Sequence, residues 1–146
     1  MQGRARKPER VGARRGRKIF HQKNTCDRVL SNPNLLNHME LSSKHCVPCE
    51  GGMPPFSVEN IKSYLVHTPG WVSDKRNIKI SKSYKFKNFV EAMSFVNKVA
   101  DIAEKEGHHP DISISYNKVN IDLTTHAIKG LSENDFILAS KINTIA

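Results

Sequence analysis

Residues 88–110 read NFVEAMSFVNKVADIAEKEGHHP, and this stretch decides the fold. Over residues 88–106, apolar side chains recur every three or four positions, which is the spacing of one face of a helix. They are Phe89, Ala92, Met93, Val96, Val99, Ala100 and Ala103. Gly107 suits the left-handed position that ends many helices, and Pro110 cannot continue one. We therefore predict a single amphipathic helix that delivers two adjacent histidines at its end.

Strand patterns flank this helix on both sides. Apolar and polar residues alternate over residues 78–86, before the helix, and over residues 112–116 and 119–123, after it. A period of two indicates a strand with one buried face. A further strand is expected near residues 71–75, and the last two strands are expected to form a hairpin.

Two more helices complete the pattern. Ser57 suits the N-cap of a helix over residues 58–67. Ser132, with Asp135 three positions later, resembles a capping box at the start of a helix over residues 133–144. The order is then helix, strand, strand, helix, strand, strand, helix. It predicts an α+β fold in which a four-stranded antiparallel sheet has the helices packed on one face.

The positive charge is concentrated at the N-terminus. The net charge is +9, but nine Lys and Arg residues and a single acid fall within residues 1–23, so the rest is almost neutral. We expect residues 1–44 to be a basic, disordered extension and residues 45–146 to form the domain. A phosphate-binding face belongs on a folded domain, so we expect this domain to have no nucleic acid partner. Residues 24–56, rich in Pro and Gly, are expected to be loops and turns.

Three interpretations of residues 1–38 remain open: a targeting segment, a nucleic-acid-binding arm, or an extension upstream of a start at Met39. No stretch approaches the ~18 consecutive apolar residues of a membrane span, so no membrane partner is expected. We expect a cytoplasmic protein, or an organellar one if residues 1–38 are a transit peptide. Cys46 and Cys49 form a C-x-x-C motif, which fits a redox pair, half a zinc site or two loop thiols.

The predicted hairpin can be given a register. With residues 117–118 as its two-residue loop, the apolar residues of both strands oppose one another on one face. Extending this register places His109 opposite His126, at the ~4.5–5.5 Å Cβ separation of paired residues. With His108 adjacent, three of the seven histidines would gather at one end of the sheet.

Such a cluster can donate and accept protons at neutral pH, because an unperturbed imidazole titrates near pH ~6.5. Glu104 lies one helical turn before His108 and could orient an imidazole or stabilise its charge. Asp135 is a capping acid, a carboxylate held close to His126, or both. The alternatives are a zinc site, since three histidines can hold zinc, and a polar surface loop without a function.

Four separated blocks of sequence resemble one known family in their order and spacing. They are EKEGHHP (residues 104–110), YNKV (116–119), LTTH (123–126) and GLSEND (130–135). The family is that of the pterin-4a-carbinolamine dehydratases, and the resemblance covers residues 45–145. The motif at Cys46 and Cys49 is similar to that of bacterial and plant-like members. Ile112 stands where many animal members have tryptophan.

The resemblance implies a hydro-lyase that dehydrates 4a-hydroxytetrahydrobiopterin to quinonoid dihydrobiopterin and water, in tetrahydropterin recycling. It implies no metal or organic cofactor, and a homodimer or homotetramer. The family's site residues fall on His108, His109 and His126, supported by Glu104, Pro110 and Asp135.

We expect His108 and His126 to transfer protons and His109 mainly to bind the pterin, without assigning which is the acid. Two alternatives remain. One is a non-catalytic protein-binding module, since some animal relatives aid the dimerisation of a homeodomain transcription factor. The other is a related enzyme that acts on a different pterin.

Overall fold

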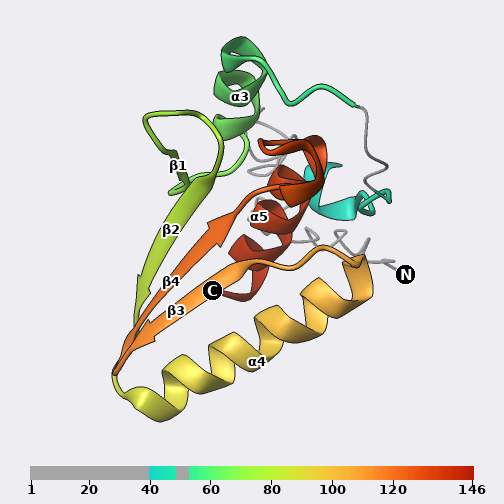
Figure 1. The fold of residues 1–146 in the computed structure, drawn as a ribbon. Helices are drawn as coiled ribbons and strands as arrows, with labels where there is room; N and C mark the ends of the chain where they lie inside the picture. Colours follow the sequence, from blue (N-terminus) through green and yellow to red (C-terminus); the bar gives the residue numbers. More distant parts are fainter. Residues whose placement is uncertain (1–39, 49–52) are drawn as a thin grey trace, which may run out of the picture.

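The structure, a computed structural model, describes residues 40–48 and 53–146. From α3 onward its elements follow the predicted order, with the short 3₁₀ helix η1 added. They are α3 (Val58–Leu65), β1 (Val72–Ser73), β2 (Ile80–Lys85), α4 (Phe89–Glu106), β3 (Asp111–Ser115), β4 (Lys118–Leu123), η1 (His126–Ile128) and α5 (Glu133–Ile145). Figure 1 shows α4 running alongside the β3–β4 hairpin, with α5 packed beside them. Among the described residues, no helix is long and apolar enough to cross a membrane.

The four strands form one antiparallel sheet in the order β1-β2-β4-β3, which confirms the predicted α+β class. Alternation along the strands gives the sheet one apolar face and one polar face. Ile80 of β2 and Val119, Ile121 and Leu123 of β4 are buried in the core. On the other face the hydroxyl of Ser83 donates a hydrogen bond to Asn120.

Helix α4 begins and ends where its sequence predicts. The side chain of Asn88 accepts a hydrogen bond from the Glu91 amide, and Gly107 closes the helix with a φ of +61°. A Cβ atom would have open space at Gly107, so the backbone conformation rather than crowding favours glycine there. The buried face is partly different from the predicted one, because Phe95 is buried whereas Phe89 is 48% exposed. The ring of Phe95 packs against the rings of Tyr84 in β2 and of Phe86, which follows β2.

The hairpin register differs from the predicted one. Ser115 pairs with Lys118, so the loop is Tyr116-Asn117 rather than residues 117–118. The loop is fixed from the opposite side of β4, where Asn117 exchanges hydrogen bonds with Phe86 through its carbonyl oxygen and its side-chain amide. The shift is by two positions, so the apolar faces stay matched. The predicted pairing of His109 with His126 is therefore wrong.

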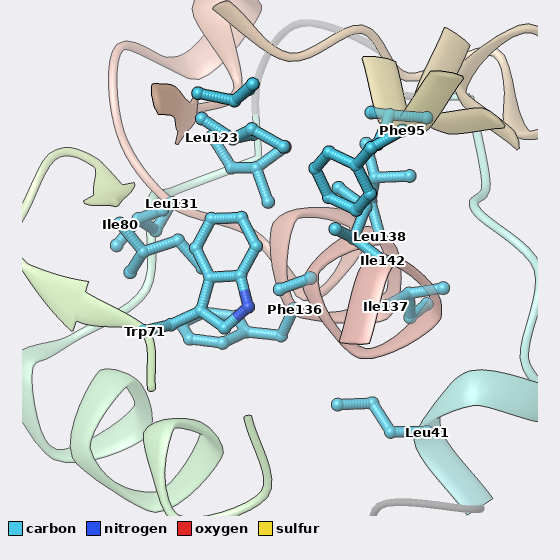
Figure 2. Packing of buried hydrophobic residues seen from close by; sticks show 14 of the residues in the cluster. Leu41, Trp71, Ile80, Phe95, Leu123, Leu131, Phe136, Ile137, Leu138 and Ile142 are labelled. Carbon is cyan, nitrogen blue, oxygen red and sulfur yellow. The ribbon is translucent and has the colours of Figure 1, made fainter. Parts of the chain in front are cut away.

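The chain before α3 also departs from the loop expected over residues 24–56. Residues 40–43 are helical, and Leu41 is buried at the margin of the core (Figure 2). Figure 2 also shows Trp71 and Phe136 at the centre of the packed cluster. The expectations for residues 1–39, including the start at Met39, lie outside the described residues, as does Cys49.

Candidate active site

Three histidines line a single pocket beyond the end of α4. The cavity has a volume of about 230 Å³. Its lining residues are Val47, Gly107, His108, His109, Thr124, Thr125, His126, Ala127 and Asn134. The histidine cluster predicted from the sequence is therefore present, although the hairpin register that suggested it is not.

His108 is the buried member of the cluster. The reversal of the chain at Gly107 turns it back toward α5, and its side chain is only 10% exposed. Its Nε2 atom lies 2.8 Å from Oδ1 of Asp135, whose side chain is fully buried. Because a carboxylate oxygen accepts hydrogen bonds, Nε2 carries the hydrogen in this contact. That tautomer leaves Nδ1 of His108 with its lone pair.

Asp135 is held by its second oxygen, Oδ2. This atom accepts hydrogen bonds from the Ser132 amide at 2.8 Å and from the Thr125 hydroxyl at 2.8 Å. Ser132 and Asp135 form the predicted capping box at the start of α5. Asp135 therefore caps a helix and positions an imidazole at once, and its side chain has little freedom to turn away.

His109, the next residue, faces the solvent. Its side chain is 61% exposed, and its Nε2 lies 3.0 Å from Oε1 of Glu104, which is 77% exposed. The two side chains pair at the end of α4, so the imidazole that Glu104 contacts is that of His109 and not that of His108. Pro110 lies between this end and β3, and it is not among the described residues that line the pocket.

His126 reaches the pocket from a different element. It is the first residue of η1, its side chain is 75% exposed, and its Nε2 lies 3.8 Å from Oδ2 of Asp111. This long, exposed contact is a weak ion pair at most. His126 can therefore move more freely than His108.

Residues 44–48, here called the strap, contact the end of α4 and the start of α5. The Cys46 amide donates to Oε2 of Glu106 at 2.9 Å, and Val47 exchanges two hydrogen bonds with the side chain of Asn134. Burial alone would raise the pKa of the Glu106 carboxyl. Hydrogen bonds from Lys141 and from the Cys46 amide outweigh that effect and hold the pKa below its usual range.

Three residues of the site were not predicted from the sequence. Thr125 lies within a quoted sequence block, yet nothing in the pattern indicates that its hydroxyl contacts the Asp135 carboxylate. Val47 and Asn134 are 87 positions apart, and no periodicity relates them. For Thr125, a hydroxyl just after a strand pattern is the only local signal.

A larger hollow lies elsewhere, at the turn end of β2, β3 and β4, with a volume of about 340 Å³. Its described lining residues include neither a histidine nor a carboxylate. The smaller pocket is the candidate for chemistry, because acid–base work requires groups that exchange protons near neutral pH. In the described residues, no group of three or more His, Cys, Asp or Glu side chains is arranged to hold a metal ion.

Comparison with known families matches residues 54–145 to the family model described as pterin 4 alpha carbinolamine dehydratase. A protein of Nitrosospira multiformis named "Putative pterin-4-alpha-carbinolamine dehydratase" is 50% identical over 106 residues, which cover 73% of this chain and 92% of that protein. A protein of the same name from Methylococcus capsulatus is 43% identical over 106 residues, covering 73% and 93% of the two chains.

A solved structure has a similar fold. It is that of a transcriptional coactivator/pterin dehydratase from Brucella melitensis, with a TM-score of 0.61 and 35% sequence identity. The match covers 63% of this chain and 98% of that one. The family match, residues 54–145, spans this chain from α3 to α5 and includes His108, His109 and His126.

Proposed function

Because this chain belongs to the pterin-4a-carbinolamine dehydratase family, we propose that its histidine pocket dehydrates 4a-hydroxytetrahydrobiopterin to quinonoid dihydrobiopterin and water. The observation that carries the proposal is the gathering of three imidazoles around one cavity, with one of them fixed by a buried carboxylate. The volume of about 230 Å³ lies below the ~300–1,000 Å³ of pockets for drug-sized ligands. A pocket of this size suits a compact bicyclic substrate.

The reaction needs one proton delivered and one removed. The bond between C4a and its hydroxyl breaks, and a proton turns the hydroxyl into water. The adjacent N5 loses its proton, and its electron pair forms the C4a–N5 double bond. Positioned imidazoles can serve both roles, and each contributes roughly 10²–10⁴-fold to the rate.

Asp135 gives His108 the features of a proton-transfer group. A carboxylate that accepts from one ring nitrogen fixes the tautomer and the orientation of the ring, and it stabilises the imidazolium that forms when the other nitrogen takes a proton. We propose that His108 and His126 transfer the two protons and that His109 mainly binds the pterin. Glu104 would then support His109, and Pro110 would hold the chain between the pocket and β3.

A stopped-flow assay of carbinolamine dehydration tests the proposal. The full-length protein should accelerate the reaction over buffer. His108→Ala and His126→Ala should lower kcat by roughly 10²–10⁴-fold, limited by the uncatalysed rate, whereas His109→Ala should mainly raise KM. Equal losses of kcat in all three variants would contradict this division of roles.

A non-catalytic role is the second candidate, because the similar Brucella melitensis protein is described as a transcriptional coactivator as well as a dehydratase. A purified protein that binds a protein partner without accelerating dehydration would favour this role. Phe89 and Val90 at the start of α4 are exposed apolar residues that such a partner could cover.

We propose in addition that the chain forms a homodimer or homotetramer, which the exposure of Ile114 and Tyr116 on the edge hairpin supports. Sedimentation equilibrium measures the assembly size directly.

A further inference from the structure

Val47 is an exposed apolar residue held at the rim of the histidine pocket. Its side chain belongs to the pocket lining, and the residue is 62% exposed. A scattered surface valine carries no meaning by itself. Here, however, the backbone on which it sits is fixed, and its neighbours in the lining are the three histidines.

The backbone of Val47 is fixed by a single side chain. Oδ1 of Asn134 accepts from the Val47 amide at 3.1 Å, and Nδ2 of Asn134 donates to the Val47 carbonyl at 2.6 Å. Asn134 is buried in the first turn of α5, next to Asp135. The side-chain amide of Asn134 therefore bonds both the N–H and the C=O of Val47, as a neighbouring strand would. The side chain of Val47 remains free to face outward.

The rest of the strap is attached independently. Cys46 is held through the buried Glu106, and Lys44 pairs with Glu133 on the surface. Losing Asn134 would therefore release the strap at Val47 and leave these attachments in place. The Cys46 thiol also donates to the backbone carbonyl of Asn134 at 3.7 Å, and that carbonyl remains when the side chain is replaced.

From this geometry we infer that Val47 contacts the substrate and that Asn134 is its positioning residue. The valine forms an apolar wall against the bicyclic ring, in the pocket whose histidines handle the protons of that ring. The ring would cover the exposed methyl groups, and their burial would add binding energy without taking part in proton transfer. This inference rests on the proposed function, since it assigns a wall to the same pocket.

The test is the separation of KM from kcat in the full-length protein. Val47→Ala should raise KM about 3- to 10-fold, because two methyl groups lose their contact with the ring, with kcat within about twofold of the parent. Val47→Ile, which keeps an apolar side chain at this position, should have a KM close to that of the parent protein. Because Val47 is on the surface, these variants test the wall even if substitution of Asn134 impairs folding.

A double-substitution cycle tests the role of Asn134. Asn134→Ala should raise KM in the parent protein, and it should raise KM much less when Val47 is already alanine, because it acts through that side chain. The matched control is Lys44→Ala, which removes another attachment of the same strap and should leave KM unchanged. Full additivity of the two substitutions would contradict a positioning role.

Direct binding separates the two ways in which the inference can fail. Equilibrium binding of 7,8-dihydrobiopterin should weaken in Val47→Ala by the same factor as KM rises. If the parent protein is active and Val47→Ala has an unchanged KM, the wall is refuted and the proposed function stands. If the parent protein neither accelerates dehydration nor binds the dihydropterin, both are refuted.

Discussion

His108 and His109 are neighbours in the chain, and each pairs with a carboxylate at almost the same distance, 2.8 Å and 3.0 Å. Their surroundings are opposite. His108 and Asp135 are buried together, whereas His109 and Glu104 both face solvent. Leaving buried hydrogen-bonding groups without their partner costs about 1–3 kcal/mol for each group, and an exposed pair is worth about 0–1 kcal/mol. Burial, and not the distance between the paired atoms, therefore determines which pair stabilises the fold and fixes the orientation of its imidazole ring.

The largest expected effect comes from breaking the buried pair. Asp135→Ala would leave the ring of His108, the Thr125 hydroxyl and the Ser132 amide without their acceptor in a fully buried place. We expect a loss of about 3–5 kcal/mol in the free energy of unfolding, measured by urea denaturation, and a loss of dehydratase activity. Asp135→Asn is the matched control for shape. A loss below about 1 kcal/mol in Asp135→Ala would show that burial does not make this pair more stabilising than the exposed one.

An intermediate effect is expected at Glu106, a buried carboxylate that accepts hydrogen bonds from Lys141 and the Cys46 amide and lies 3.3 Å from the exposed ring of His45. The pKa of Glu106 is lower in the folded protein than its usual value. The unfolded chain therefore takes up the proton first as the pH falls, so the stabilisation is complete above the usual pKa of about 4.3 and is lost as the pH drops through the folded value.

Glu106→Gln should accordingly reduce the free energy of unfolding by about 1–3 kcal/mol at pH 7. The difference from the parent should shrink below pH ~4. Urea denaturation at a series of pH values measures both. A difference that stays constant down to pH ~2 would mean that the charge of Glu106 is not what stabilises the strap.

The smallest effect is expected at the exposed pair. Glu104→Gln should change the free energy of unfolding by less than about 0.5 kcal/mol, because both side chains are hydrated before and after the change. Raising the salt concentration should remove any difference in the free energy of unfolding between Glu104→Gln and the parent protein. Thermal denaturation at low and high salt makes the measurement, and a destabilisation comparable to that of Asp135→Ala would show that exposure is a poor guide here.

The sequence predicted those features that depend on local periodicity. The span of α4, its glycine end and the matched apolar faces of the hairpin follow from spacing and capping rules that act over a few residues. The capping role of Asp135 is of the same kind.

Features set by distant parts of the chain could not be predicted. The hairpin loop is held by Phe86, which follows β2, and the ring of Phe95 packs against those of Tyr84 and Phe86. Sequence alone does not distinguish His108 from His109, because which of two adjacent residues is buried depends on where α5 docks. The contact between Val47 and Asn134 has the same long-range origin.

Asp135 uses one oxygen to cap α5 and the other to hold His108. This shared use has a consequence for the order of folding. The ring of His108 cannot be fixed until the first turn of α5 has formed and docked, because both events need the same carboxylate. If the pocket has the proposed function, recovery of activity during refolding should be coupled to the docking of the C-terminal helix. Fraying of that single turn would release the ring of His108 and, because Asn134 lies in the same turn, the strap at Val47 as well.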